Sequence, residues 1–254
     1  MTPCCQRSTK PVPPKFAPDW GNADPHLSSD GKSLYFISNC AAAEDIGSTP
    51  AFHIWSLDLA AGSDKPVRLP APINIPGRDN WSPSMASNGD LCFGCDRIAA
   101  HGGFKIWVSH RTPTWHSMIE ELVDSINTTG NEVEPWIAPD GSYPIFSGTA
   151  RKDSTGQYEL YLSRRITGVW QGAHPVGGGI NTTESEFNQS VSPDGKCLYF
   201  SSDRPLVGSI GERSDFPRND RSIHGIGNGK SDIYRVPMSA LGFPRPRMNT
   251  DYRD

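Results

Sequence analysis

Apolar and polar residues alternate along short segments of this chain, and the same kind of segment occurs four times. Each copy has an alternating run, an Asp-Gly or Asn-Gly pair and a second alternating run, as in SVSPDGKCLYFSSDR at residues 190–204. Alternation with a period of two is typical of strands with one buried face. Asp-Gly and Asn-Gly supply the positive φ angles that a two-residue hairpin turn requires. The pattern therefore predicts a hairpin at each of the pairs 30–31, 88–89, 140–141 and 194–195.

Each copy continues with a variable loop, a third strand and a weaker fourth strand. The third strands are HIWSLDL, FKIWVSH, YELYLSR and SDIYRVP, and the first three copies end in PIN, SIN and GIN. A single sheet cannot bury both of its faces, whereas copies stacked around an axis bury them against each other. We therefore predict an all-β fold, a β-propeller of four blades with four antiparallel strands each, and five blades are the alternative.

The repeat also sets the expected domain boundaries. Residues 1–20 are a Pro-rich lead that we expect to be flexible, and residues 21–254 form a single propeller domain. The four blades are expected at roughly 21–78, 79–130, 131–184 and 185–254.

The motif SPDGKxLYFSSDR, followed by DIY, resembles the TolB-type, WD-repeat-like β-propeller family, and the resemblance covers roughly residues 20–250. It implies the fold, and it implies a role in recognition at the cell envelope or periplasm. Such propellers also occur in carbohydrate-linked proteins and beside peptidase domains. The chain shows four copies where TolB has six, and we expect no counterpart of TolB's N-terminal domain in it. Its N-terminus also lacks the apolar core of a signal peptide.

Charge and cysteine spacing exclude several classes of function. The net charge is −4 with no basic block, which argues against a nucleic-acid partner. No apolar run approaches the roughly 20 residues that span a bilayer. Cys92 and Cys95 lie in one predicted strand, where alternation places them on opposite faces. We therefore expect free thiols there, and neither a zinc site nor a disulfide.

The first strand of each copy has one apolar and one polar set of alternating residues. The apolar set, predicted to pack between blades, is Leu27, Met85, Ile137 and Val191 with Ala23, Trp81, Val133 and Phe187. The polar set, predicted to line the central channel, is Asn22, Asp24, His26, Asn80, Ser82, Ser84, Glu132, Glu134, Trp136, Glu186, Asn188 and Ser190. Unpaired polar groups are costly to bury between strands, so their place around an axis is the simpler interpretation.

Three interpretations of this channel stay open. It is a water-filled channel lined by hydrogen-bonded side chains, or a binding site for a sugar or for Ca²⁺ through Trp136 and the Asn and Glu side chains. The third is glycoside hydrolysis, which needs two carboxylates about 5 to 9.5 Å apart. Its candidate carboxylates are Asp24, Glu132, Glu134 and Glu186.

A second candidate site is the long loop at residues 205–230. Long loops on rigid scaffolds often bind partners. Its mixed charges favour a protein or a polar partner, and they come from Arg213, Asp215, Arg218, Asp220, Arg221 and His224. Asn127 and Asn181 fit the glycosylation pattern, but they recur with the repeat and are expected to form turns between blades.

The sequence therefore predicts a non-catalytic recognition module. We expect it to bind a partner protein, an envelope glycan or a small polar ligand at the channel mouth and the 205–230 loop. The alternative is a glycosidase-type hydrolase that uses the inner-strand carboxylates. No cofactor is expected, apart from Ca²⁺ under the second interpretation of the channel, and the oligomeric state stays open.

Overall fold

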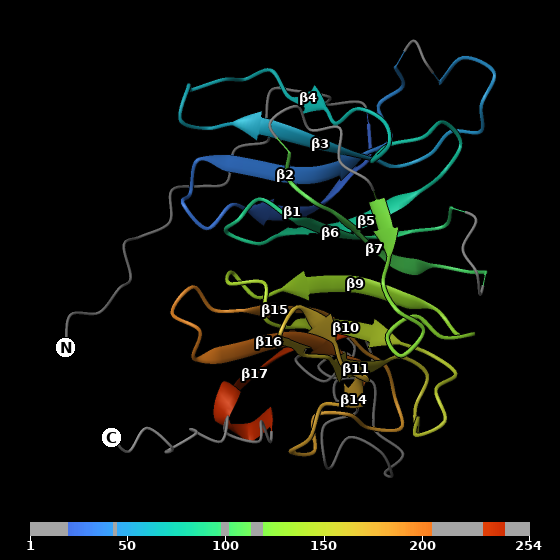
Figure 1. Ribbon diagram of the computed structural model, residues 1–254, viewed down its shortest axis with the longest axis vertical. Helices are drawn as coiled ribbons and strands as arrows, with labels where there is room; N and C mark the ends of the chain where they lie inside the picture. Colours follow the sequence, from blue (N-terminus) through green and yellow to red (C-terminus); the bar gives the residue numbers. More distant parts are fainter. Residues whose placement is uncertain (1–19, 43–44, 98–101, 113–118, 205–230, 242–254) are drawn as a thin grey trace, which may run out of the picture.

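The computed structural model describes residues 20–42, 45–97, 102–112, 119–204 and 231–241, without the side chains of 119–121. In these ranges the strands form one antiparallel sheet for each sequence repeat, with the sheets of blades 1 and 2 in the upper half of Figure 1 and those of blades 3 and 4 in the lower half. Strand order within each of the four sheets follows the chain, so each sheet is a meander. The predicted all-β propeller fold of four blades is confirmed.

The blades have the following strands. Blade 1 contains β1 (Asn22–Leu27), β2 (Ser33–Ser38), β3 (His53–Asp58) and β4 (Val67–Arg68). Blade 2 contains β5 (Asn80–Met85), β6 (Leu91–Cys95), β7 (Lys105–Ser109) and β8 (Ile119–Glu121). Blade 3 contains β9 (Glu132–Ile137), β10 (Pro144–Gly148), β11 (Glu159–Leu162) and β14 (His174–Pro175), with the hairpin β12 (Arg165–Ile166) and β13 (Val169–Trp170) inserted. Blade 4 contains β15 (Glu186–Val191), β16 (Cys197–Ser202) and β17 (Asp232–Pro237), followed by the 3₁₀ helix η2 (Met238–Leu241).

Two predicted features fall outside the described residues. The fourth strand expected for blade 4 lies within 242–254, and the long loop lies at 205–230. In the described residues, no helix is long and apolar enough to cross a membrane.

The hairpin between the first two strands is longer than the predicted two-residue turn. In blade 1 the loop spans 28–32, and the Gly31 N–H donates to the Ser28 carbonyl at 2.8 Å. Asp30 Oδ1 accepts from the Ser28 hydroxyl and from the Lys32 N–H. Only the glycine of the pair has a positive φ, 70° at Gly31. The prediction of a two-residue turn was therefore wrong. The Asp30 side chain closes the longer loop by hydrogen bonds, so Asp30 itself does not need a left-handed backbone conformation.

Each first strand contains a β-bulge. In β1, Ala23 pairs with Ile37 and His26 pairs with Tyr35, so β1 carries one extra residue. The same shift occurs in β5, β9 and β15. The first residue within the shift has a positive φ in every blade: Asp24 at 51°, Ser82 at 47°, Glu134 at 55° and Asn188 at 53°. A shift of one residue turns the following side chains to the opposite face, so alternation counted across the bulge is inverted.

Adjacent blades pack through three apolar clusters. In each cluster a third-strand residue of one blade joins the last apolar residue of the next blade's first strand. The pairs are Ile54 with Met85, Ile106 with Ile137, and Leu160 with Val191. This confirms the predicted place of Met85, Ile137 and Val191 between blades.

The two cysteines of β6 illustrate the alternation in the second strands. Cys95 lies in the cluster between blades 1 and 2, and Cys92 lies in the cluster between blades 2 and 3. They therefore point to opposite faces, as predicted, and both are free thiols.

Candidate functional site

The first strands of all four blades converge on one place, where two hollows meet. The larger hollow has a volume of about 520 Å³ and the smaller about 340 Å³. Both are lined by the four bulge residues Asp24, Ser82, Glu134 and Asn188, which we call the bulge ring. Each blade contributes one residue to this ring, so the site exists only when the blades are assembled.

The two hollows differ in chemistry. The larger one, the aromatic hollow, is lined beyond the bulge ring by Trp81, Phe104, Val133, Tyr158, Ser185, Phe187 and Asp203. The smaller one, the proline hollow, is lined by Pro25, His26, Pro83, Ser84, Pro135, Trp136, Gln189 and Ser190. An apolar wall with a few polar groups is typical of ligand sites, and the aromatic hollow matches that description.

Hydrogen bonds join the bulge ring across neighbouring blades. Asp24 Oδ2 accepts from the Ser82 N–H at 2.9 Å and from the Ser82 hydroxyl at 3.0 Å. Glu134 Oε2 accepts from the Asn188 N–H at 2.7 Å and from the Ser147 hydroxyl at 3.3 Å. The carboxylate of Asp24 or Glu134 therefore accepts a hydrogen bond from the backbone N–H of the bulge residue in the next blade.

The ring is held in a strained backbone conformation. A left-handed conformation costs a residue other than glycine about 1 to 3 kcal/mol, and such strain clusters at functional sites. Asp24, Ser82 and Glu134 also precede prolines, which disfavours helical backbone angles at these positions. The inter-blade hydrogen bonds offset part of this cost.

Two titratable groups at the site have shifted pKa values. Burial raises the pKa of the Glu134 carboxyl, its hydrogen bonds from Asn188 and Ser147 oppose that rise, and the Asp24 carboxylate adds to it. Burial lowers the pKa of His26. His26 Nε2 accepts a hydrogen bond from the Met85 N–H at 3.0 Å, which requires a neutral imidazole. His26 is thus an inter-blade contact, and Glu134 is a carboxyl that resists ionisation.

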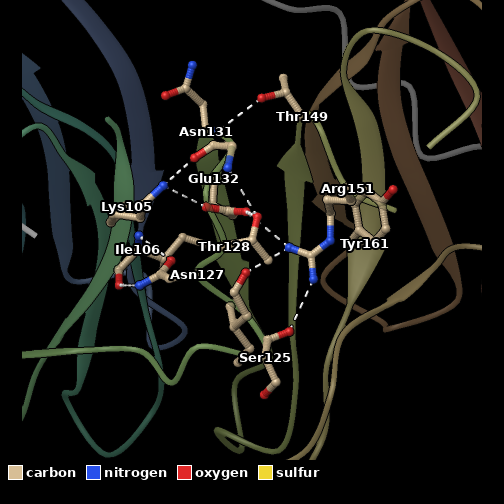
Figure 2. A network of polar contacts seen from close by, with 12 residues as sticks. Lys105, Ile106, Ser125, Asn127, Thr128, Asn131, Glu132, Thr149, Arg151 and Tyr161 are labelled. Atoms are coloured by element: carbon tan, nitrogen blue, oxygen red, sulfur yellow. Dashed lines mark hydrogen bonds and ion pairs between the residues drawn. The ribbon is translucent and has the colours of Figure 1, made fainter. Parts of the chain in front are cut away.

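Glu132, predicted to line the channel, lines neither hollow. It is completely buried between blades 2 and 3, as Figure 2 shows. Its carboxylate accepts from Lys105 Nζ at 3.0 Å, Arg151 Nη1 at 3.1 Å and the Thr128 hydroxyl at 2.5 Å. Lys105 is also fully buried and donates to the Gly130 carbonyl. The Glu132 carboxylate is the shared counter-charge of Lys105 and Arg151, so Glu132 holds two blades together and is not accessible from the channel.

Glu186 occupies the equivalent position at the junction of blades 3 and 4 and is also completely buried. It accepts from the Thr182 N–H at 2.9 Å, from the Thr182 and Ser202 hydroxyls, and from Arg204 Nη2 at 3.2 Å. Asn80 is likewise buried and donates to Asn74 Oδ1 at 2.9 Å. The placement of these residues in the channel is therefore corrected, and the bulge explains it, because they lie on the other side of the register shift from Trp136 and His26.

The bulge also changes the position of the apolar residues that follow Asn80, Glu132 and Glu186, because it turns them toward the channel. Trp81, Val133 and Phe187 were predicted to pack between blades, and all three line the aromatic hollow. Trp81 also packs against the apolar cluster between blades 1 and 2, as predicted. Ala23 and Asn22 are exposed in β1. At least one hollow is lined by each of Asp24, His26, Ser82, Ser84, Glu134, Trp136, Asn188 and Ser190.

An arginine that follows the second strand was missed as a structural element. Arg97 lies over the rings of Phe93 and Trp107, at 5.4 and 5.1 Å from their centroids. Its guanidinium also donates to the Pro72 and Ile73 carbonyls of the preceding linker. Arg151 and Arg204 repeat this arrangement in blades 3 and 4. An Arg follows the second strand in three of the four copies, and this recurrence could have indicated its structural role from the sequence.

The recurring Ile-Asn pair has a structural role at each blade junction. Asn127 accepts from the Ile106 N–H and donates to the Ile106 and Leu122 carbonyls. Asn74 and Asn181 bind the third strands of their own blades in the same way. Asn127 is fully buried, so its amide is not accessible for glycosylation, and the expected turn role is the one the structure supports.

The remaining predicted site residues belong to the long loop at residues 205–230. Arg213, Asp215, Arg218, Asp220, Arg221 and His224 lie outside the described residues. Across the described ranges, no three His, Cys, Asp or Glu side chains are grouped as metal ligands. The carboxylates accessible from the hollows are Asp24, Glu134 and Asp203, and the first two are engaged by backbone N–H groups of the next blade.

Comparisons with known proteins give only distant similarities. No family model and no curated protein matches the chain. Among solved structures, TolB from Acinetobacter baumannii has 18% sequence identity and a TM-score of 0.43 over 70% of this chain and 39% of that chain. A structure from a study of two prolyl endopeptidases has 13% identity and a TM-score of 0.45 over 75% of this chain and 25% of that one. The tricorn protease has 12% identity and a TM-score of 0.41 over 82% and 17%. The chain spans well under half the length of each of these structures.

Proposed function

We propose that the protein is a non-catalytic recognition module that binds a polar ligand or a partner's side chains in its central channel. The observation that carries this proposal is the meeting of the two hollows at the bulge ring, where four blades each supply one strained residue. We further propose that the ligand is carried by a partner protein at the cell envelope, as the resemblance to the TolB-type family implies.

The aromatic hollow supports a ligand with both an apolar face and polar groups. Phe104, Tyr158 and Phe187 offer ring faces on which a sugar or an apolar side chain can stack. The indole N–H of Trp81 is buried, and no acceptor within the described residues binds it. This donor is enclosed, so we expect the polar groups of a ligand to bind at the bulge ring, which lines the same hollow.

A glycoside hydrolase is the second candidate function, and the state of Glu134 favours it. A general acid must be protonated near neutral pH, and burial raises the pKa of Glu134 in that direction. Asp24 would then be the second carboxylate, since Glu132 and Glu186 are enclosed between blades. Against this function, both carboxylates already accept backbone hydrogen bonds that hold the blades.

The test is a thermal-shift panel of oligosaccharides, cell-wall fragments, peptides and Ca²⁺ against EDTA. A ligand at 100 times its Kd adds about 2.7 kcal/mol of stability. That corresponds to a rise in Tm of several degrees, at about 2 to 4 °C per kcal/mol for a domain of this size. Tyr158→Ala and Phe104→Ala should abolish the shift. Val169→Ala, on the exposed β12–β13 hairpin, is the matched control and should retain it. A panel without any shift would contradict the proposal.

The same ligands decide between binding and hydrolysis. The protein is incubated with each oligosaccharide that binds, and new reducing ends are measured. A recognition module releases none. Turnover that is lost in Glu134→Gln, while binding persists, would establish the hydrolase instead.

A further inference from the structure

One residue in the third strand of blade 4 breaks a pattern that the other blades obey. The equivalent third-strand residues are Ile54, Ile106, Leu160 and Ile233, each directly before the aromatic residue of its strand. The first three have relative exposures of 0%, because the next blade covers them. Ile233 is 80% exposed. Blade 4 therefore presents the surface that receives a following blade, and this surface is open.

Blade 1 presents the other half of the same interface. The last apolar residue of the first strand packs onto the preceding blade, as Met85 at 8% and Ile137 at 5% exposure show. Leu27 holds this position in β1 and is 54% exposed. Within the described residues the chain thus forms three inter-blade interfaces and leaves two unmatched halves of a fourth, with Ile233 on one and Leu27 on the other.

These two halves do not meet within one chain. Strand β1 packs on β5, β5 on β9, and β9 on β15, whereas in the described residues β1 makes no comparable contact with β15, β16 or β17. Figure 1 shows the same arrangement, with the sheet of β2 and β3 at one end of the long axis and β16 and β17 near the other. In the part of the chain that the structure describes, the series of blades is therefore an open arc.

We propose that a second copy of this chain closes the arc head to tail. Blade 4 of each copy receives blade 1 of the other, so that Ile233 of one copy packs on Leu27 of the other at two identical junctions. Two copies of four blades make a ring of eight, the upper end of the usual range of four to eight blades. Three copies would exceed that range. A head-to-tail interface forms a closed ring only if its rotation closes, so the proposal requires that the two junctions together complete the turn.

The complementary surfaces repeat an interface that the chain already builds three times. Each existing junction joins an aliphatic third-strand residue to an aliphatic first-strand residue. The Ile233–Leu27 junction would have the same composition. It would also place β1 of one copy beside β15 of the other, so the second copy would contribute to the lining of the channel.

The experiment measures molar mass by size-exclusion chromatography with light scattering over a range of protein concentrations. The expected result is a species of twice the 27.7 kDa chain mass. Ile233→Lys and Leu27→Glu should each leave a species of single-chain mass, with circular dichroism unchanged because both residues are exposed. Ile46→Lys is the matched control, because Ile46 is also exposed and apolar but belongs to the loop between β2 and β3, and it should keep the double mass.

Mixing the two variants tests whether the junction joins different chains. In an equimolar mixture of Ile233→Lys and Leu27→Glu chains, one junction pairs Lys with Glu and the other is unchanged. The double mass should therefore return. A wild-type protein of single-chain mass at all concentrations would overturn the proposal in favour of closure within one chain. A mass that grows without limit, or a double mass that both variants keep, would overturn it as well.

Discussion

Asp24 of blade 1 accepts two hydrogen bonds from Ser82 of blade 2, one from the backbone N–H at 2.9 Å and one from the hydroxyl at 3.0 Å. Both residues are at the bulges of their strands and both have positive φ. Glu134 and Asn188 repeat the relationship between blades 3 and 4. The bulge therefore does two things at once: it turns a carboxylate toward the axis, and it presents the backbone N–H that the preceding carboxylate binds.

Replacing Asp24 by Ala should destabilise the protein. The Ser82 N–H and hydroxyl would lose their acceptor, and a partly buried donor left unpaired costs about 1 to 3 kcal/mol. Asp24→Asn keeps an acceptor oxygen and should cost less than Asp24→Ala. The measurement is the free energy of unfolding by urea. Asp64→Ala, at an exposed loop position, is the control and should stay within about 0.5 kcal/mol of wild type. Equal effects of Asp24→Ala and Asp64→Ala would contradict the role assigned to Asp24.

Replacing Glu132 by Gln should be more severe. The substitution leaves the fully buried Lys105 and the largely buried Arg151 without their shared counter-charge. Breaking a buried ion pair by removing one partner costs about 3 to 5 kcal/mol. Urea unfolding should show this loss, whereas Lys196→Gln, which removes an exposed ion pair with Asp194, should change stability by less than about 1 kcal/mol. A Glu132→Gln protein of wild-type stability would show that the cluster does not hold blades 2 and 3.

The repeat was sufficient to predict the fold, because hairpin punctuation and alternation are local signals. The assignment of residues to the channel failed at Glu132 and Glu186, and it missed Trp81 and Phe187, for one reason. A bulge inserts a single residue, and nothing in the alternation of a six-residue strand marks its position. The proline that follows Asp24, Ser82 and Glu134 was the available hint, since a proline in an inner strand indicates an irregular pairing.

The roles of Arg97 and Asn127 show a different limit of sequence analysis. Both residues recur with the repeat, so the sequence indicates that they are important. Their contacts, however, join the strands of a blade to the linker between blades. Spacing along the chain does not reveal which carbonyls a side chain reaches. Three-dimensional contacts such as Arg97 with the Pro72 and Ile73 carbonyls come only from the folded chain.

Replacing Arg97 by Lys should destabilise blade 2 even though the charge is kept. A planar guanidinium stacks on two rings and binds two carbonyls together, and an ammonium cannot reproduce this geometry. We expect a loss of about 1 to 3 kcal/mol, the cost of buried acceptors without partners. Arg78→Lys is the control, since Arg78 is partly exposed and makes only long contacts to Asp96, 4.0 Å to the carboxylate and 3.4 Å to the carbonyl. If both variants unfold at the same urea concentration, the stacking of Arg97 contributes nothing.

His26 should make the protein less stable as the pH falls below neutrality. Burial holds its pKa in the folded state below the ordinary value of 6.5, so the unfolded chain binds a proton where the folded chain does not. The contribution of His26 to stability is therefore fully present above pH 6.5 and is lost progressively as the pH falls through 6.5 toward the lower, folded-state pKa. Burial lowers the pKa of His53 as well, so two histidines contribute to the dependence.

The variant His26→Gln separates the two contributions, because Gln keeps an oxygen that accepts from the Met85 N–H but does not titrate. The free energy of unfolding is measured by urea at steps from about pH 7 to pH 5, a range in which unperturbed histidines titrate and most carboxylates stay ionised. Wild type should lose more stability across this range than His26→Gln, and the remaining slope of the variant should fall further in a His26→Gln, His53→Gln double variant. Parallel curves for wild type and His26→Gln would mean that protonation of His26 does not oppose the blade 1–blade 2 contact.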